Sequence, residues 1–331
     1  MLKVIVLCLI TLISRGMRLG VVLTSHDTVA GASLSTLVSE QLDAFRSIDL
    51  KIVSQDEQTV ENQYGKVTLV VVVLEQPPCY PVIGLGLQHT IVFLQRHRPG
   101  DEPPPHAINH HANVRALADM NVESIIATTC VGTLVASFPP GRVGLARQYI
   151  DFTGVPITFH QSKAVFTSVT QPFDESLNKQ LEVTLRRVQE LPEKVRLQYT
   201  YWLSCGPQYE TEAEVTAIDR FGGEVCGFTM PREAKVTGPT RQGQPLQTHS
   251  CSGCMQHAPC FMTPGFTRAP CKSTAQLCAE LGIPYSALLI ATNWAAGRHP
   301  CASRVRTAQE IACSGYVSLQ SHVAARGGAR S

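Results

Sequence analysis

The sequence SIIATTCVGT at residues 124–133 places a short, uncharged, β-rich run directly before a patch of hydroxyl and thiol side chains. The same arrangement, an apolar run that ends in polar residues, occurs at residues 90–97 and 285–297. Runs of this kind are typical of strands buried on both faces of an α/β sheet. Because ligands of such sheets bind beyond the carboxyl ends of the strands, the three polar patches are predicted to form one pocket.

Strand-like and helix-like runs alternate along the chain, which predicts an α/β fold with a central mixed, partly parallel sheet surrounded by helices. Further strands are expected at 19–23, 67–74, 143–150 and 199–203, and helices at 109–120, 172–190, 212–221 and 273–281. Residues 24–66 are predicted to be irregular and polar. Thr211 is a predicted N-cap, because Glu214 three residues later completes the pattern of a capping box.

The chain divides by composition into several parts. Residues 1–16 form an apolar N-terminal extension, residues 17–300 are expected to be the folded domain, and residues 301–331 are a divergent C-terminal segment. Within the domain, residues 237–271 lose all periodicity, which predicts a disordered insertion. The extension is similar to a signal peptide but lacks a small-x-small cleavage site, and several cysteines lie inside strand or helix patterns. A cytoplasmic location is therefore expected.

Length and composition exclude several classes of partner. A chain of 331 residues with 44% hydrophobic and 16% charged residues can bury a large core. The net charge of +2 gives no electrostatic basis for binding nucleic acid or an anionic membrane. The apolar run at 4–13 is too short to span a bilayer. We therefore expect neither a nucleic-acid nor a membrane partner.

Two other ligand classes are weakly indicated. A dinucleotide site would need a G-x-G-x-x-G turn after the first strand, where Gly20 stands alone. Cys251, Cys254, His257 and Cys260 could bind zinc, but their spacing departs from common zinc modules and no metal site is predicted.

The polar patches supply the donors that a phosphate dianion needs. Arg96 offers a bidentate fork, and His97 follows it directly. The Thr129 hydroxyl and the N–H of Cys130, in a loop expected to enter a helix, add further donors. Thr229 brings another hydroxyl from a distant part of the sequence. Together these residues predict an oxyanion site.

A second group of residues suits a sugar and a purine. Asn293 ends the last apolar run and offers both an amide donor and an amide acceptor, which matches the edge of a purine. Phe228 offers an apolar plate for a ring, and Glu233 is expected to receive sugar hydroxyls. Simpler interpretations stay open: Arg96 and His97 as a solvated strand end, the threonines as a turn, and Asn293 as a helix N-cap.

Taken in order, these segments resemble the nucleoside phosphorylases of purine salvage, in the methylthioadenosine phosphorylase branch. The resemblance runs over residues 17–236 and 273–297, and its most specific segments are 96–97 with 104–113, 127–134, 206–214 and 227–234. It implies a pentosyltransferase that uses inorganic phosphate to cleave the N-glycosidic bond of a purine nucleoside to free base and ribose 1-phosphate. No metal or organic cofactor is implied, and the branch is commonly homotrimeric.

The resemblance also assigns roles to individual residues. Its phosphate-binding residues are Ser25, Arg96, His97, Thr129, Cys130 and Thr229. Asn293 is implied to recognise the base and to be the catalytic residue. The other implied substrate contacts are Phe228, Trp294 and Ala295, with Thr211 contributing to specificity.

The residue at position 293 decides the predicted substrate. Adenine-selective members of the branch have Asp there, whereas Asn293 can donate to a 6-oxo group and accept from the protonated ring. A 6-oxopurine nucleoside is therefore predicted, with methylthioadenosine phosphorolysis as the alternative. Residues 23–26 lack the family's glycine-rich phosphate loop, and Arg98 and Asp101 replace a Gly and a His, so a weakened homologue that only binds ligand is a further alternative.

Overall fold

The computed structural model describes residues 17–24, 50–76, 87–97, 103–160, 162, 164–234 and 280–299, together with Cys8, Ser35, Val38 and Ser39. The predictions for Ser25, Arg98, Asp101, residues 237–271 and residues 301–331 lie outside these ranges, as does nearly all of residues 1–16.

The described elements begin with four strands, and helices are interspersed among the strands that follow. The strands are β1 (Arg18–Leu23), β2 (Lys51–Asn62), β3 (Gly65–Gln76), β4 (Leu87–Gln95), β5 (Ser124–Thr133), β6 (Val143–Asp151), β7 (Gln198–Leu203), β8 (Val225–Gly227) and β9 (Tyr285–Trp294). The helices are the 3-10 turn η2 (Pro105–Ala107), α3 (His110–Asp119), α4 (Glu175–Val188), α5 (Glu212–Arg220) and α6 (Met230–Glu233).

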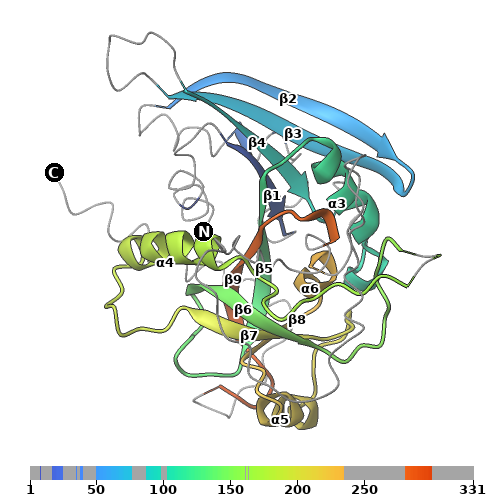
Figure 1. Ribbon diagram of the computed structural model, residues 1–331. Coiled ribbons are helices and arrows are strands. Elements are labelled where there is room, and N and C mark those ends of the chain that lie inside the picture. The colour runs from blue at the N-terminus through green and yellow to red at the C-terminus, as the bar shows by residue number, and fades with distance from the viewer. Residues whose placement is uncertain are drawn as a thin grey trace, which may run out of the picture.

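Among the described residues, nine strands form one mixed sheet in the order β2-β3-β4-β1-β5-β8-β7-β6-β9. Strands β4, β1, β5 and β9 are parallel where they pair, whereas β2, β3 and β4 form antiparallel pairs. Strand β9 pairs with both β6 and β5, so β5, β8, β7, β6 and β9 close into a ring (Figure 1). The fold thus combines an open wing with a closed ring, and β5 belongs to both.

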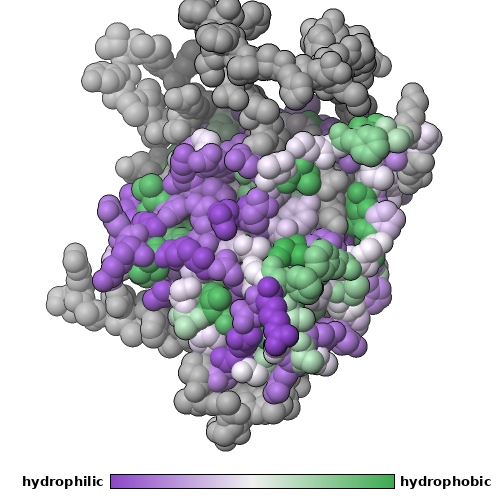
Figure 2. Space-filling model, turned by 60° about the horizontal axis from the view of Figure 1, so that its bottom comes forward, coloured by the Kyte–Doolittle hydropathy of each residue, from purple (hydrophilic) through white to green (hydrophobic). Residues whose placement is uncertain are grey.

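The sheet is covered by helices on both faces. Helix α3 packs on β2, β3 and β4, and its Ala112, Ala116 and Leu117 belong to the larger apolar cluster. Helix α4 contacts β6 and β9, and its apolar residues join a second cluster on the other face (Figure 1). Seen from the side of α5, the described surface is largely polar, and apolar residues are scattered over it (Figure 2).

Local signals explain where the longer helices begin. Asn109, Asp174 and Thr211 each accept a hydrogen bond from the backbone three residues later. At Thr211 the capping box is complete, because the Glu214 carboxylate accepts the Thr211 N–H in return, which confirms the prediction.

Two structural predictions were wrong. Strand β2 occupies residues that we expected to be irregular; it is an edge strand whose side chains are exposed or only partly buried, so its sequence lacks the apolar signal of a core strand. Thr129 and Cys130, expected to lie in a loop that enters a helix, belong instead to β5, which continues to Thr133 because this half of the strand pairs with β9 and β8.

Candidate active site

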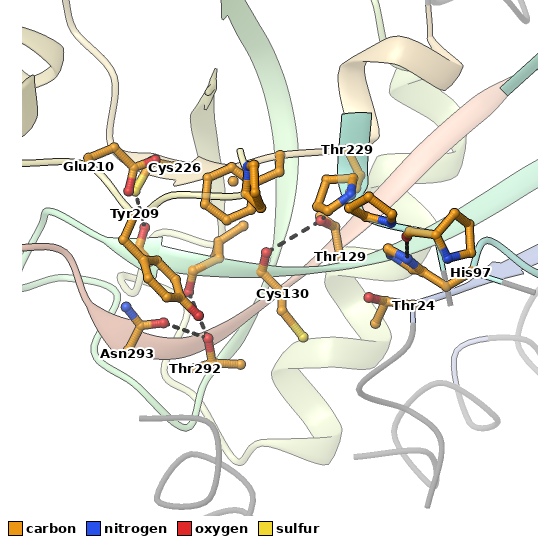
Figure 3. A pocket seen from close by; sticks show the side chains of 18 residues that line it. Thr24, His97, Thr129, Cys130, Tyr209, Glu210, Cys226, Thr229, Thr292 and Asn293 are labelled. Carbon is orange, nitrogen blue, oxygen red and sulfur yellow. Dashed lines mark hydrogen bonds between the residues drawn. The ribbon is translucent and has the colours of Figure 1, made fainter. Parts of the chain in front are cut away.

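A cavity of about 320 Å³ lies at the carboxyl ends of the parallel strands, where the sequence predicts it. Thr24 follows β1, His97 follows β4, Thr129 lies on β5 and Asn293 lies on β9. The remaining wall is formed by residues 103–105, 130–132, 207, 209–210, 226–229 and 292. Segments that are far apart in the sequence therefore meet in one pocket (Figure 3).

One end of this pocket gathers hydroxyl and imidazole groups. The hydroxyls of Thr129 and Thr229 lie 3.4 Å apart, although these residues are separated by a hundred positions in the chain. Thr24, whose N–H donates to the Thr128 hydroxyl at 3.0 Å, lies at the same end (Figure 3). These residues, with His97, form what we call the hydroxyl end of the pocket. Of the predicted phosphate residues, His97, Thr129, Cys130 and Thr229 line the cavity.

His97 is held in a defined orientation. Its Nδ1 lies 2.9 Å from the Pro103 carbonyl, which can only accept, so Nδ1 carries the hydrogen. Burial lowers the pKa of His97, and the nearby Arg96 charge lowers it further, against the opposing effect of the bond to Pro103. The imidazole is therefore neutral at pH 7, with Nε2 as an acceptor.

Arg96 lies beside the pocket and is not part of its lining, which differs from the prediction. The guanidinium is fully buried in an ion pair with Glu233, and its Nη1 donates to the Thr128 carbonyl at 2.8 Å. Glu233, expected to receive sugar hydroxyls, is 1% exposed and does not line the cavity either. The two opposite charges neutralise each other in the core, so Glu233 is not placed to contact a ligand in this cavity.

The other end of the pocket gathers amide, carboxylate and phenol groups. The Asn293 Oδ1 accepts from the Thr292 hydroxyl at 2.8 Å, and its Nδ2 donates to the Trp294 carbonyl at 3.1 Å. Asn293 lies within β9, so the helix N-cap interpretation is wrong. Glu210 and Tyr209 stand on the same side of the pocket as Asn293 (Figure 3). These three residues define the amide end.

Glu210 is a pocket residue that the sequence analysis missed. Its carboxylate accepts from the Ser204 hydroxyl at 2.5 Å and lies next to the Cys226 thiol. Burial raises the pKa of Cys226 well above its ordinary value, and the Glu210 charge raises it further, so Cys226 stays a neutral thiol. The sequence signal that could have identified Glu210 is its position within the family-like segment 206–214, from which only the Thr211 cap was inferred.

Phe228, predicted to contact a ring, lines the pocket. It is fixed by the backbone of Gly206, which has a φ of 59°; a Cβ at this position would lie 3.0 Å from the Phe228 Cγ. Tyr209 supports the same ring, with 5.9 Å between the ring centroids. The position therefore requires a glycine, both for its φ and for its space.

Three residues predicted to contact the substrate do not line the cavity. Trp294 and Ala295 follow Asn293 but do not line the cavity; Ala295 is buried in an apolar cluster with Val215 and Ile218 of α5. Thr211 caps α5 and is also outside the lining. Direct contact of these residues with a ligand in this pocket is not supported by the geometry.

The described part of the chain has no group of three or more His, Cys, Asp or Glu side chains that could hold a metal ion. It also contains no helix with the length and apolar character needed to cross a membrane.

The sequence profile of the Phosphorylase superfamily matches residues 51–237. This chain belongs to that family. It is 35% identical over 195 residues to the 6-oxopurine nucleoside phosphorylase of Pyrococcus furiosus, which covers 56% of this chain and 68% of the relative. It is 31% identical over 167 residues to the S-methyl-5'-thioadenosine phosphorylase of Thermofilum pendens, which covers 50% of this phosphorylase and 63% of the relative. The family resemblance found in the sequence is confirmed.

The fold of this phosphorylase is shared with solved structures. Methylthioadenosine phosphorylase from Schistosoma mansoni, solved with adenine, superposes with a TM-score of 0.59 at 19% sequence identity, over 93% of this chain and 88% of the other. This similarity confirms the predicted α/β fold class. The ring of β5 to β9, which contributes Thr129, Cys226 and Asn293 to the pocket, is thus part of a phosphorylase fold.

Proposed function

We propose that this phosphorylase transfers the pentosyl group of a 6-oxopurine nucleoside to inorganic phosphate, which yields the free base and ribose 1-phosphate. The observation that carries this proposal is the two-ended pocket, with the hydroxyl end suited to an oxyanion and the amide end suited to a purine. A cavity of about 320 Å³ falls in the range typical of small-molecule sites. The relative from Pyrococcus furiosus supports the same substrate class.

Base selectivity follows from the donors and acceptors at the amide end. Asn293 has a second Nδ2 hydrogen for the 6-oxo group, and its Oδ1 can accept from a protonated N7. Glu210 accepts from the N1–H that a 6-oxopurine carries. Adenine has a donor at position 6 and an acceptor at N1, the opposite of a 6-oxopurine. Its 6-amino group would therefore meet the amide N–H of Asn293, and its N1 lone pair would meet the Glu210 carboxylate, so neither hydrogen bond would form.

The reaction breaks the bond between C1' and N9, whose electron pair leaves with the base, and forms a bond between C1' and a phosphate oxygen. The base takes up a proton at N7 from solvent, which balances the proton that the attacking phosphate releases, and Asn293 stabilises the protonated base by accepting from it. At the other end, the Thr129 and Thr229 hydroxyls orient the phosphate, whose charge stabilises the cationic ring as the old bond breaks. Phe228 packs against the sugar, so much of the catalysis is positioning.

A phosphorolysis assay with inosine, guanosine, methylthioinosine and methylthioadenosine, with and without phosphate, tests this proposal. Phosphate-dependent cleavage of the 6-oxopurine nucleosides is expected. Preference for methylthioadenosine would favour the alternative that the Thermofilum pendens relative supports. If no nucleoside is cleaved although phosphate raises the melting temperature, the chain is a weakened homologue that only binds ligand.

The remaining parts of the proposal rest on the family resemblance. We propose a cytoplasmic homotrimer that needs no metal or organic cofactor and uses inorganic phosphate as co-substrate. Ser25, next to Thr24 in the chain, is proposed to add a hydroxyl to the phosphate site.

A further inference from the structure

Behind the hydroxyl end of the pocket lies an ion pair that the reaction scheme above does not use. Arg96 donates from Nε to one carboxylate oxygen of Glu233 and from Nη2 to the other, the latter bond being 3.0 Å long. The exposed fractions of the two side chains are 0% and 1%. A paired side-on contact of this kind fixes the plane of the guanidinium as well as its distance.

The carboxylate of this pair is itself held in place. The Tyr285 hydroxyl donates to its Oε2 at 3.0 Å, and the His110 Nδ1 lies 3.7 Å from its Oε1. Burial alone would raise the pKa of Glu233, but the charge of Arg96 and the hydrogen bonds lower it to about 2. Glu233 is therefore an anchored anion.

The guanidinium also reaches the strand that carries a pocket residue. A guanidinium has five N–H hydrogens. Within the described residues, one hydrogen on each nitrogen is bonded: two to Glu233, and one from Nη1 to the Thr128 carbonyl at 2.8 Å. The Thr128 carbonyl belongs to the peptide that leads into Thr129, so this side of Arg96 lies directly behind a pocket residue.

We propose that Glu233 is a positioning residue for phosphate: it holds Arg96, whose Nη1 donates to the Thr128 carbonyl, and so fixes the peptide that places the Thr129 hydroxyl beside that of Thr229. This inference rests on the proposed function. Helix α6 connects the pocket with the ion pair. Thr229, which lines the pocket, directly precedes α6, and Glu233 is the last residue of α6. Without the carboxylate, Arg96 would be a buried charge with no fixed orientation.

The variant Glu233→Gln distinguishes two effects of Glu233: its hydrogen bonds, which orient Arg96, and its negative charge, which repels phosphate. The amide keeps the size of the side chain, but its NH₂ group would face an N–H of Arg96, which displaces the guanidinium. We expect the KM for phosphate to rise about tenfold or more, while the KM for the nucleoside changes by no more than about twofold. If Glu233 acted only through its negative charge, removing it would strengthen phosphate binding.

Two further variants complete the experiment. Glu182→Gln is the matched control, because Glu182 also pairs with an arginine, Arg186, and accepts a bond from Gln198, but lies on α4 away from the pocket. It should leave both KM values unchanged. Tyr285→Phe removes one anchor of Glu233 and keeps the ion pair, so the phosphate KM should rise about threefold. This variant tests the inference even if Glu233→Gln does not fold.

Phosphate binding is measured independently by thermal denaturation of each full-length protein over a range of phosphate concentrations. Wild-type protein stabilised by phosphate, with Glu233→Gln needing about tenfold more phosphate for the same shift, supports the inference. Equal or tighter phosphate binding by the folded Glu233→Gln variant overturns it, as does an unchanged phosphate KM in Tyr285→Phe. Wild-type protein that neither binds phosphate nor cleaves nucleosides would instead refute the proposed function, and the inference with it.

Discussion

Replacing Asn293 by Asp is expected to move the preference of the pocket from 6-oxopurine to 6-aminopurine nucleosides. The amide has one orientation, because Oδ1 accepts from Thr292 at 2.8 Å and Nδ2 donates to the Trp294 carbonyl at 3.1 Å. An aspartate keeps the first bond but turns its second oxygen towards that carbonyl and towards the base. It has no hydrogen for a 6-oxo group and can accept one from a 6-amino group.

The size of this change follows from the bonds involved. A 6-oxopurine loses a donor and meets an unsatisfied oxygen, which costs about 1.5–3 kcal/mol and lowers kcat/KM for inosine about 10- to 150-fold. A 6-aminopurine gains a hydrogen bond of about 0.5–1.5 kcal/mol. Together, the ratio of kcat/KM for inosine to that for adenosine should fall at least about 30-fold.

The assay is steady-state phosphorolysis of inosine and adenosine by wild-type protein and variant at the same phosphate concentration. Asn121→Asp is the control, because it introduces the same charge at an exposed turn after α3 and should leave the ratio unchanged. A ratio that stays within about threefold of the wild-type value in Asn293→Asp would refute the assigned role of Asn293.

Other perturbations give separate tests. Glu210→Gln should lower kcat/KM for inosine about tenfold, because the amide oxygen would take the bond from Ser204 and an NH₂ group would face the N1–H of the base; an equal fall for adenosine would argue against base recognition. Gly206→Ala should destabilise the protein by about 1–3 kcal/mol in chemical denaturation and raise the KM for nucleoside, since φ is 59° and the new Cβ would press on Phe228; normal values for both would contradict the fixed ring position. The pKa of Glu233 is about 2 in the folded protein against an ordinary 4.5, so its stabilisation is full above pH 4.5 and is lost as the pH falls towards 2. The difference in free energy of unfolding between wild type and Glu233→Gln should therefore shrink over this range, and a constant difference would show that the charge of Glu233 is not stabilising.

Much of the fold is predictable from the sequence because its strands are buried on both faces. The runs that became β4, β5 and β9 are short and apolar, and burial in the sheet is the reason for that pattern. The capping box at Thr211 is equally local, since it depends on two residues three positions apart. Strand β2 was missed because an exposed edge strand has little apolar burial to reveal it.

The site is less predictable, because side-chain pairing between distant residues leaves no local pattern. Arg96 and Glu233 each looked like a ligand group on its own, and only the fold shows that they neutralise each other. Glu210 was overlooked for the same reason, because Asn293 reaches the same side of the pocket from another part of the sequence. Residue type predicted a chemistry for the pocket, and the topology decided which side chains reach it.

The ring of strands is completed by its final member. Strand β9 pairs with β5 on one side and with β6 on the other, and it also carries Asn293. During synthesis, the wing of β1 to β4 can therefore assemble well before the amide end of the pocket is complete, since this end needs Asn293 to leave the ribosome. A nascent chain arrested before β9 would expose two unpaired strand edges, which makes this stage of translation the one most in need of protection from aggregation.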